Sequence, residues 1–574
     1  MTEADLSNSV IVIESPNKAD KYRKYTGATV IATVGLFKDI PKASFGINLK
    51  TYYPTFRILP GRSAVMERLK KSKGKIVIIA TDPDREGYAI GDHVYAEIKS
   101  YAKSVYRAEV REITEKGIKE AIACAVPFEK TNQGQYKAFL GRRVGDRLIG
   151  YMLSPAISNK MKQVYSVGRV QSPGLRMVVD REKEIKSFKK EPYYQIKLTI
   201  DKNGELFNAY HESGNIKNKG TADNILAKLK ALNAEGEVLS IEKEELEKPP
   251  KGPFTTSTLQ QAAYNRLKFD TDKTMAVAQG LFEKGLITYH RTDSQRISID
   301  FIQELRTQIK NDYGKKYCPE QPFIYSSKNS QAEAHEGIRP TEIISDCEQG
   351  EYIKKHGLDA DQEGLFRLIY NRAIASQMAK AETERMTIII KYGEERFKAI
   401  GNRQLFDGWS RQYEDKASDK DEDNNKLPKL EPGEKVIINK LDMLEKETRP
   451  PKRYTEATLV KELEIKGIGR PSTYAAIIKS MKTRRYVINE KGALLPTEAG
   501  EKLIEILQKE YPWVIDYGFT KDMENYLDLV QAGQGDWQLF AKNIHEKTGF
   551  TEPPIWKIGN KTGGNSNGKR ASRN

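Results

Sequence analysis

Short apolar runs alternate with helical patterns over roughly the first 125 residues of the chain. The runs at 9–13, 29–34 and 75–81 are rich in β-branched residues and predict buried strands. The stretches near 18–25 and 86–99 have the spacing of apolar positions that is typical of helices. This alternation predicts an α/β domain at the N-terminus.

Acidic residues directly follow two of these predicted strands. Glu14 comes after the first run and Asp82 after the third, with Asp84 and Glu86 at alternating positions beyond it. Because sites in open α/β sheets are built beyond the carboxyl ends of strands, we expect these acids to converge. A hard divalent cation such as Mg²⁺ would offset their charge. A solvated acidic turn explains residues 82–86, taken alone, equally well.

The remaining chain is first helical and then mixed. Residues 135–185 have a helical pattern, and strand-like alternation appears at 193–200, 386–392 and 435–438. A helical block at about 255–375 lies between these β segments, which suggests one domain inserted into another.

Two segments are predicted to lack a fixed structure. Residues 414–423 carry six acids and two lysines without a large apolar residue, which predicts a mobile loop. The tail, residues 559–574, is basic and rich in Gly, Asn and Ser, and we expect it to be disordered.

Composition limits the classes of protein that remain. The 574 residues are enough for several domains, and no apolar run approaches the roughly 18–20 residues that span a bilayer. We therefore expect a cytoplasmic protein without membrane contact. The cysteines Cys124, Cys318 and Cys347 stand too far apart for a disulfide framework or a zinc ribbon. The net charge of +16 suggests a polyanionic partner, although it is spread over a long chain.

A tyrosine follows two predicted helices in the middle of the chain. Ser257 is expected to cap the first helix, with Gln260 completing a capping box, and the second helix runs over about 270–284. Tyr289 and Arg291 come next. A tyrosine beside an arginine is suited to attack on a phosphate, because the arginine neutralises the phosphoryl charge. Among 29 tyrosines, a purely structural role is the competing interpretation.

Taken together, the motifs resemble the type IA DNA topoisomerases. Glu14 and the acids at 82–86 match the toprim pattern, which primases and nucleases share, and the Tyr289 segment matches the segment with the nucleophile. The other matching segments follow in family order and extend the resemblance over about residues 10–530: 111–114, 141–151, 166–172, 254–260, 334–341, 454–457, 467–474 and 519–524.

The resemblance implies a set of roles. Tyr289 would attack a single-strand phosphodiester and form a 5′-phosphotyrosine, and Arg291 would stabilise the phosphate. Glu14 would handle the proton of the 3′ oxygen with Lys18 nearby, and His335 matches a family histidine close to the tyrosine. Mg²⁺ would be held by Asp82, Asp84 and Glu86, with Glu14 beside them. The residues expected to bind single-stranded DNA are Arg142, Arg143, Arg147, Ser166, Val167, Gly168, Arg169, Val170, Gln171 and Arg484.

The implied fold is a multidomain α/β and α+β torus. Its domains would be a toprim domain (1–139), a split helical base domain (140–189 and 448–550), a split β-rich arch (190–248 and 375–447), a helical gate domain with Tyr289 (249–374) and a basic tail (551–574). Leu36, Tyr88 and His290 depart from the residues common in the family.

The expected activity is Mg²⁺-dependent relaxation of negatively supercoiled DNA by a monomer, without ATP or zinc. No GxxxxGK sequence is followed by Ser or Thr, as a phosphate loop requires, which agrees with an ATP-independent reaction. Two alternatives remain open: another toprim enzyme such as a primase or nuclease, and a noncatalytic protein that binds single-stranded DNA.

Overall fold

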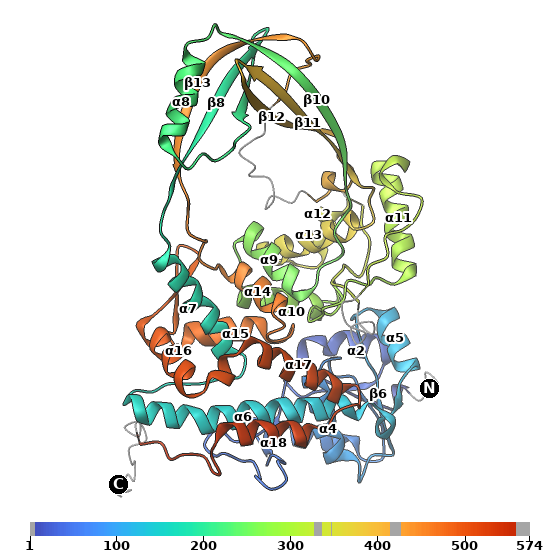
Figure 1. Cartoon of the computed structure of the whole chain (residues 1–574). Coiled ribbons are helices and arrows are strands. Elements are labelled where there is room, and N and C mark those ends of the chain that lie inside the picture. Colours follow the sequence, from blue (N-terminus) through green and yellow to red (C-terminus); the bar gives the residue numbers. More distant parts are fainter. Residues whose placement is uncertain (1–5, 327–335, 346, 414–425, 558–574) are drawn as a thin grey trace, which may run out of the picture.

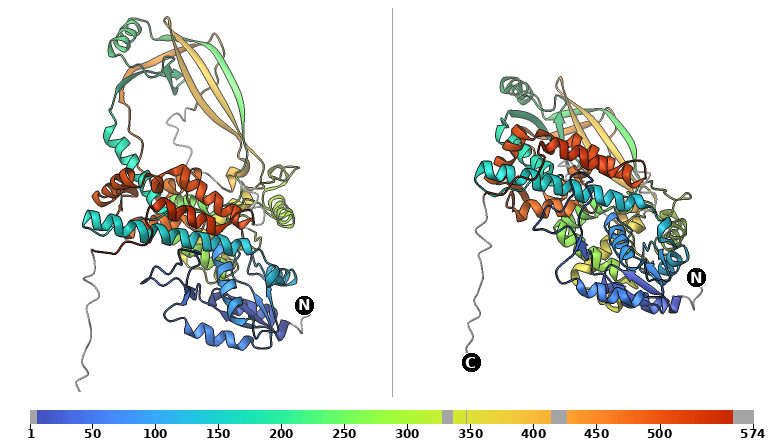
Figure 2. Two further views of the ribbon diagram at one scale, coloured as in Figure 1. Left: turned by 60° about the horizontal axis from the view of Figure 1, so that its bottom comes forward. Right: turned by 90° about the horizontal axis from the view of Figure 1, so that it is seen from below.

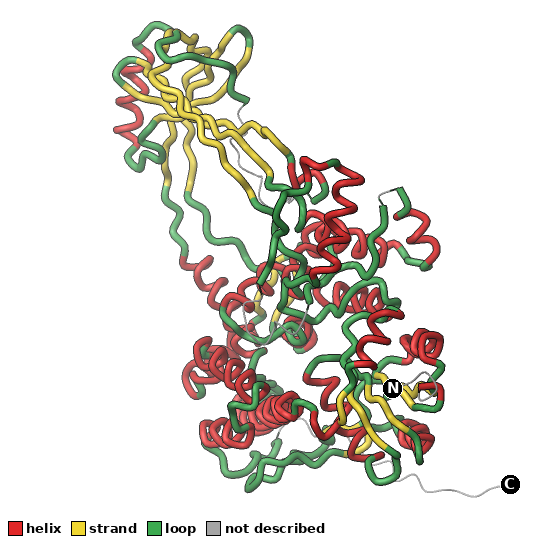
Figure 3. The backbone as a smooth tube through the Cα atoms, turned by 90° about the vertical axis from the view of Figure 1, so that its right-hand side faces the viewer, coloured by secondary structure: helices red, strands yellow, loops and turns green. Residues whose placement is uncertain are grey.

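The computed structural model describes residues 6–326, 336–345, 347–413 and 426–557. Its units form a ring, with a strand-rich unit at one end and helical units with a small sheet at the other (Figure 1). Figure 3 shows that the strands are concentrated in these two places. This arrangement agrees with the predicted torus.

The N-terminal unit is a five-stranded sheet in the order β2-β1-β5-β6-β7. Strands β1, β2, β5 and β6 are parallel, and β7 is antiparallel to β6. The strands are β1 (Val10–Ile13), β2 (Thr29–Ala32), β5 (Ile76–Ile79), β6 (Ser104–Arg107) and β7 (Val126–Pro127). The helices of the unit are α2 (Ala19–Thr26), α3 (Ser63–Leu69), α4 (Arg85–Ile98) and α5 (Glu115–Ala123), and a short ribbon pairs β3 (Lys38–Asp39) with β4 (Arg57–Ile58).

Both faces of this sheet are buried, which explains the continuous apolar runs in the sequence. Val10 and Val12 pack with α3 and α4, whereas Ile11 and Ile13 point to the opposite face. That second face shares a core with Tyr289 and its neighbouring helices. The sheet therefore carries the strand-end acids on a rigid support against the tyrosine segment.

The tyrosine segment belongs to a second unit, the α9–α13 unit. Its helices are α9 (Thr256–Leu267), α10 (Thr271–Glu283), α11 (Ile299–Tyr313), α12 (Gln349–Lys355) and α13 (Ala360–Ala375). The predicted capping residue was wrong by two positions: Thr255 caps α9, and its capping box is completed by Thr258. Ser257 instead lies inside the helix and donates to Glu464 at 2.8 Å.

A third unit, the α6 unit, contains the longest helix, α6 (Gln133–Met161). Helix α18 runs alongside α6 (Figure 2). A Cβ at Gly145 would lie 2.9 Å from Ile544 and 3.0 Å from Phe540, so glycine permits this close approach. The other elements are α7 (Gln171–Ser187), α14 (Glu456–Ile465), α15 (Tyr474–Thr483), β14 (Val487–Glu490), β15 (Ala493–Pro496), α16 (Glu498–Glu510), α17 (Tyr517–Gln531) and α18 (Trp537–Thr548).

The strand-rich unit is a closed barrel in the order β10-β11-β12-β9-β8-β13. Alternating residues such as Ile196, Leu198 and Ile200 fill its interior. Its strands are β8 (Pro192–Lys202), β9 (Glu205–His211), β10 (Glu235–Lys248), β11 (Ala381–Tyr392), β12 (Glu395–Phe406) and β13 (Lys435–Glu447), and α8 (Lys219–Lys230) covers one side. Strands β8 and β13 lead to the α6 unit, whereas β10 and β11 lead to the α9–α13 unit.

Short 3₁₀ helices complete the elements: η1 (Pro16–Lys18), η2 (Lys70–Ser72), η3 (Phe128–Lys130), η4 (Lys315–Tyr317), η6 (Gly408–Arg411) and η7 (Pro512–Ile515). The domain limits given above stay a prediction. Some hydrophobic cores include residues from both sides of a predicted limit. Ile40, Ile47 and Ala89 of the first unit, for example, belong to the core of the α6 unit. Within the described residues, no helix is long and apolar enough to cross a membrane.

Candidate active site

Glu14 and Asp82 lie near each other at one edge of the N-terminal sheet. They follow β1 and β5, which pair in parallel with Val12 opposite Ile79. Both acids line a pocket of about 370 Å³ together with Arg291. The expectation that the strand-end acids converge is therefore confirmed.

A tight turn after β5 positions the next two acids. Asp84 caps α4, where its carboxylate accepts a hydrogen bond from the backbone N–H of Gly87 at 2.8 Å. A Cβ at Gly87 would lie 2.0 Å from the carbonyl oxygen of Asp82, so this turn requires glycine. Glu86 follows in the first turn of α4, near the positive end of the helix dipole.

Lys18 lies beneath the acids. Its side chain is 2% exposed, and its ammonium group forms an ion pair with Asp82. The same ammonium group lies 4.6 Å from the ring centroid of Phe282 in α10. Lys18 therefore links the sheet edge to the α9–α13 unit and partly compensates the charge of Asp82.

Burial and the remaining negative charge raise the pKa values of two of these acids. The pKa of Glu14 is raised to about 8, first by burial and then by the negative charges of Asp82 and Asp84. The pKa of Glu86 is raised by burial and by Asp84. A carboxyl that retains its proton near neutral pH can donate it to a leaving oxygen.

Backbone hydrogen bonds from two other segments hold the Tyr289 segment in place. The N–H of Tyr289 donates to the carbonyl of Arg111 at 3.0 Å. The N–H of Thr288 donates to the carbonyl of Arg339 at 2.9 Å, and the Thr288 hydroxyl donates to Gly337 at 2.8 Å. The motifs at 111–114 and 334–341 thus meet at the tyrosine, although they are far apart in sequence.

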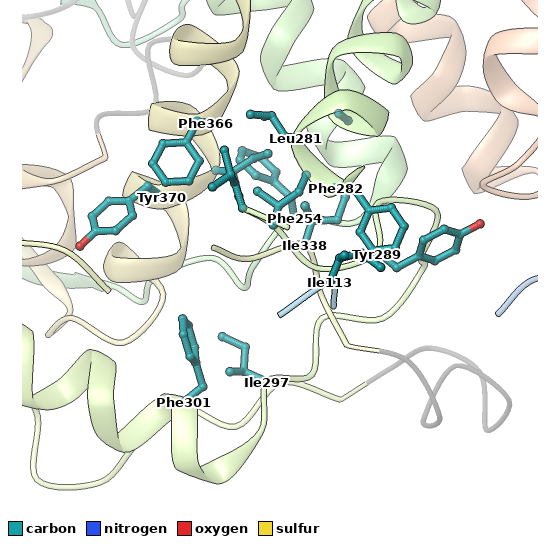
Figure 4. Close-up of a cluster of buried hydrophobic side chains, with 14 of the residues drawn as sticks. Ile113, Phe254, Leu281, Phe282, Tyr289, Ile297, Phe301, Ile338, Phe366 and Tyr370 are labelled. Carbon is teal, nitrogen blue, oxygen red and sulfur yellow. The ribbon is translucent and has the colours of Figure 1, made fainter. Parts of the chain in front are cut away.

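The Tyr289 side chain points from an apolar cluster toward the acids. Its ring packs edge-on against Phe282, with its hydroxyl directed away from the cluster (Figure 4). The hydroxyl donates to the Oδ2 atom of Asp84 at 2.7 Å. Burial raises the pKa of Tyr289 well above its usual value, and the charges of Asp84 and Asp82 raise it further. The phenol is therefore neutral, and its proton must be removed for nucleophilic attack.

Arg291 completes the contact between the two units. Its Nη1 atom lies 3.3 Å from the Oδ2 atom of Asp84, so tyrosine and arginine share one carboxylate oxygen. Burial alone would raise the pKa of Asp84, but the charge of Arg291 and the hydrogen bonds from Gly87 and Tyr289 outweigh it and lower that pKa. The Arg291 side chain remains 32% exposed, so an entering phosphate can contact it.

The acids fit a divalent cation by charge but are not arranged as a finished metal site. Among the residues that the structure describes, no three His, Cys, Asp or Glu side chains form a group that could hold a metal ion. Asp82 is paired with Lys18, and Asp84 with Tyr289 and Arg291. Burial and then the nearby carboxylates of Asp82 and Asp84 raise the pKa of Glu14, and carboxylate oxygens are the ligands that Mg²⁺ prefers.

A groove leads away from the acids along α6. One cleft, of about 620 Å³, includes Asp84 and Arg291, and the next, of about 760 Å³, includes Gly168. Arg142, Arg143 and Asp146 line both clefts, which therefore form one groove.

The three arginines of α6 have different surroundings in this groove. Arg142 donates to the Ser472 hydroxyl at 3.3 Å, and Arg143 forms a forked ion pair with Asp39. Arg147 donates to the backbone carbonyl of Ile40 at 3.0 Å, and its side chain is largely buried. Arg142 and Arg143 therefore remain more accessible than Arg147.

Arg169 does not have the exposure expected of a DNA contact. Its side chain is 0% exposed, with Nε 2.9 Å from Asp146 and Nη1 2.6 Å from Glu524. In this structure the guanidinium joins α6 to α17 and supports the wall of the groove. Arg169 also lines the second cleft, and its contact with DNA stays a prediction.

The other residues of the motif line the second cleft as well. Gln171 accepts hydrogen bonds from the Ser480 hydroxyl, at 2.9 Å, and from Arg484, which connects α7 to α15. The N–H of Ser166 donates to the Tyr486 hydroxyl at 2.7 Å. The cleft is also lined by Val167, Gly168 and Val170.

An ion-pair network that sequence reasoning missed joins the acids to the groove. Arg85, next to Asp84, lies 2.5 Å from one carboxylate oxygen of Asp528, and Arg470 lies 2.6 Å from the other. Asp528 and Glu524 are one turn apart on α17. The family motifs at 467–474 and 519–524 had marked this region, but they gave its residues no role.

The family departures have different surroundings. Leu36 lines the first cleft. Tyr88 is 7% exposed, donates to Glu109 and packs under Arg107, so it is part of the sheet core. His290 is buried beside Phe282, and burial lowers its pKa well below the usual value.

Some predicted features lie outside the described residues. His335 is one of them, so its relation to Tyr289 stays a prediction. The acidic segment at 414–423 and the tail at 559–574 also lie outside.

Comparisons with known proteins cover nearly the whole chain. The DNA topoisomerase family model matches residues 130–542, and the toprim domain model matches residues 9–113. DNA topoisomerase 1 of Campylobacter jejuni is 38% identical over 560 residues, covering 94% of this chain and 78% of that protein. DNA topoisomerase 1 of Aquifex aeolicus is 37% identical over 549 residues, covering 94% and 98%. The solved structure of full-length topoisomerase I from Thermotoga maritima matches with a TM-score of 0.81 and 33% identity, covering 94% of this chain and 90% of that one.

Proposed function

The chain belongs to the type IA DNA topoisomerase family, and from this premise we propose that Tyr289 is its nucleophile and that Arg291, Glu14 and Lys18 assist it. The observation that carries the proposal is the shared contact of Tyr289 and Arg291 with Asp84. This contact places a phenol, a cation and an acidic cluster around one point. Asp84, Glu86 and Arg291 line the first cleft, and the Tyr289 hydroxyl lies behind them on the Asp84 carboxylate.

The proposed reaction exchanges one phosphodiester for another. The phenolic oxygen of Tyr289 attacks phosphorus as its proton passes to the Asp84 carboxylate that accepts its hydrogen bond. The bond from phosphorus to the 3′ oxygen breaks, and the 3′ oxygen takes a proton from Glu14, so a 5′-phosphotyrosine and a 3′-hydroxyl result. The reverse attack by the 3′-hydroxyl rejoins the strand and releases Tyr289. Because the phosphotyrosine ester conserves the energy of the broken bond, rejoining requires no ATP.

The surrounding residues have separate roles in this reaction. Arg291 neutralises the charge that grows on the phosphoryl oxygens. Glu14 exchanges a proton with the 3′ oxygen, supported by its place in the same pocket as Asp82 and Arg291. Lys18 acts as a positioning residue, because its ammonium group holds Asp82.

We propose that Mg²⁺ is held by Asp82, Asp84 and Glu86, with Glu14 beside them. When bound, the ion supplies positive charge next to the phosphate and relieves the repulsion among the carboxylates.

The groove supplies the binding site for a single strand. Arg142 and Arg143 present guanidinium groups to phosphates, and the backbone at Gly168 allows close approach. Arg147, Gln171 and Arg484 shape the further part of the groove. Negative supercoiling favours this substrate because it provides the unpaired segment.

Strand passage requires the two sides of the site to separate. Tyr289 belongs to the α9–α13 unit, and Asp84 to the N-terminal unit, so opening the ring breaks the contact between them. We propose that the predicted domain limits mark the moving bodies and that one monomer, acting on DNA in the cytoplasm, suffices.

The alternatives are tested together with the proposal. Wild-type protein incubated with negatively supercoiled plasmid and Mg²⁺ should produce a ladder of relaxed topoisomers, and Tyr289→Phe should produce none. Permanent nicks would instead indicate a toprim nuclease, and an unchanged linking number with retained binding would indicate a noncatalytic protein. Relaxation by Tyr289→Phe would reject Tyr289 as the nucleophile.

A further inference from the structure

An exposed tryptophan, Trp556, lines the groove and has no role in the proposed reaction. Trp556 is 37% exposed and lines the second cleft together with Arg147 and Arg484. Trp409 and Trp537 are 8% and 4% exposed, so they behave as ordinary core residues. An indole left in a charged cleft forgoes the burial that normally stabilises such a side chain.

Trp556 is held in place although its segment is neither helix nor strand. Asn159, in the last turn of α6, donates from Nδ2 to the carbonyl of Ile555 at 2.8 Å. Its Oδ1 atom accepts from the N–H of Lys557 at 2.8 Å. One side-chain amide thus fixes the peptide groups on both sides of Trp556, which is the expected arrangement for a residue whose position matters.

The surroundings of Trp556 differ from the rest of the groove. Val164, which lines the same cleft, is 60% exposed, and Tyr151 also lines it. In the part of the chain that the structure describes, no other aromatic ring packs against the indole. The groove therefore passes from acids and arginines near Asp84 to a partly apolar, aromatic end.

We propose that Trp556 is a stacking platform for one unpaired base of the bound DNA strand, at the end of the groove away from Tyr289. Arginines hold phosphates, but an indole offers a flat apolar surface that fits the face of any base. Base stacking on aromatic side chains is tolerant of sequence, as an enzyme acting on any unpaired segment requires. The proposal rests on the proposed function, because it assumes that the groove holds a single strand.

The first test measures the affinity for single-stranded oligonucleotides in the noncleaving Tyr289→Phe protein. Adding Trp556→Ala should weaken binding about tenfold, the loss typical of one stacked base. Trp556→Phe should retain most of the affinity because it keeps a ring. Ile555→Ala is the matched control, because the Ile555 side chain is next to Trp556 in the sequence, is 82% exposed and does not line the cleft. This variant should bind oligonucleotides like the parent protein.

An indole that blocks the cleft would change the affinity in the opposite direction. If Trp556 covers the cleft and obstructs the strand, Trp556→Ala will bind the oligonucleotide more tightly, and the proposal is overturned. Equal affinity of Trp556→Ala and the parent protein overturns it as well. Equal weakening by Ile555→Ala would assign the effect to the segment and not to the ring.

A second test locates the base. Oligonucleotides that lack a single base are bound one by one, and one missing base at a fixed distance from the cleavage site should cost the parent protein about tenfold in affinity. In Trp556→Ala the same missing base should cost nothing, because its partner is gone. A position-specific penalty, together with wild-type protein that fails to relax plasmid, would reject the proposed function but retain the stacking site. Plasmid relaxation without any such penalty would reject the stacking site alone.

Discussion

The hydroxyl of Tyr289 donates a 2.7 Å hydrogen bond to Asp84, a residue 205 positions away in the sequence. The bond crosses from the α9–α13 unit to the N-terminal sheet unit. It holds the proposed nucleophile, as a neutral phenol, against the carboxylate that also contacts Arg291. In the closed ring, the α9–α13 unit and the N-terminal unit are therefore joined by a hydrogen bond at the proposed active site.

Two substitutions of Asp84 should separate activity from stability. Asp84→Asn retains an oxygen that can cap α4 but loses the charge, so we expect cleavage of oligonucleotides to fall by about 100-fold or more with little change in stability. Asp84→Ala should lose the cap too and cost about 1 kcal/mol of unfolding free energy. Single-turnover cleavage and urea unfolding measure the two effects; normal cleavage by Asp84→Asn would contradict the proposed role.

Arg291 should tolerate lysine better than glutamine. Arg291→Gln removes the positive charge beside the phosphate, and we expect cleavage to slow by roughly 100- to 1000-fold. Arg291→Lys keeps the charge but loses the planar fork, so its loss should be smaller. Single-turnover rates at saturating oligonucleotide distinguish this from weaker binding. Equal rates for the two variants would argue against charge stabilisation.

Gly87 should not accept even one methyl group. In Gly87→Ala the new Cβ would meet the Asp82 carbonyl oxygen, so we expect about 3 kcal/mol of destabilisation and loss of cleavage as the acids move. Gly350→Ala is the control, because nothing lies within 4 Å of its Cβ position in α12. That change should be neutral or stabilise by about 1 kcal/mol. Thermal unfolding of both variants measures the contrast.

The interactions of Glu524 with Arg169 and Arg470 beside the groove should contribute less to stability at low pH. Burial alone would raise the pKa of Glu524, but the arginines around it, first Arg169 and then Arg470, lower that pKa to about 2. A depressed carboxyl pKa contributes stability above its unfolded value, near 4.5, and that contribution disappears as pH falls through about 2. Wild type should therefore lose about 3 kcal/mol across this window.

Glu524→Gln provides the comparison for this pH dependence. It should be less stable than wild type at pH 7, because Arg169 is left buried without its partner. The difference should shrink toward pH 2, as the wild-type carboxyl also becomes neutral. Chemical unfolding at a series of pH values measures it, and a constant difference would contradict the assignment.

Metal binding should be detectable without any reaction. If the acids hold Mg²⁺, the ion should raise the temperature of unfolding at neutral pH, with about 2.7 kcal/mol gained at 100 times its dissociation constant. Asp82→Asn should remove most of this shift, and EDTA should reverse it in wild type. An equal shift in Asp82→Asn would place the metal elsewhere.

Local chemistry made part of the site predictable from the sequence. The runs before Glu14 and Asp82 are apolar on both faces because the sheet is covered on both sides, so the strands and their terminal acids were recognisable. The capping residue of α9 was misplaced because Thr255, Ser257 and Thr258 all have hydroxyl groups that can cap. Only the backbone conformation selects among them.

Other features depend on partners that are distant in the chain. Arg169 is buried because Glu524, 355 positions away, packs on it, and no local pattern records that pair. Strand β10 continues through residues 242–248, which are charged except for Leu246 and have no strand-like alternation. This part of β10 is a strand because β11 pairs with it along its length. The hydrogen bonds to the neighbouring strand stabilise a conformation that the local sequence does not favour.

The two pairs of strands that leave the barrel end on different bodies, β8 and β13 on the α6 unit and β10 and β11 on the α9–α13 unit. In the proposed reaction, one end of the cut DNA strand is attached covalently to Tyr289 on the α9–α13 unit, and the other end is held only by contacts in the groove. The polypeptide of the barrel then takes the place of the missing phosphodiester as the continuous link between the two ends. The length and stiffness of those strands set how far the ends can part, and thus how large an object can pass between them.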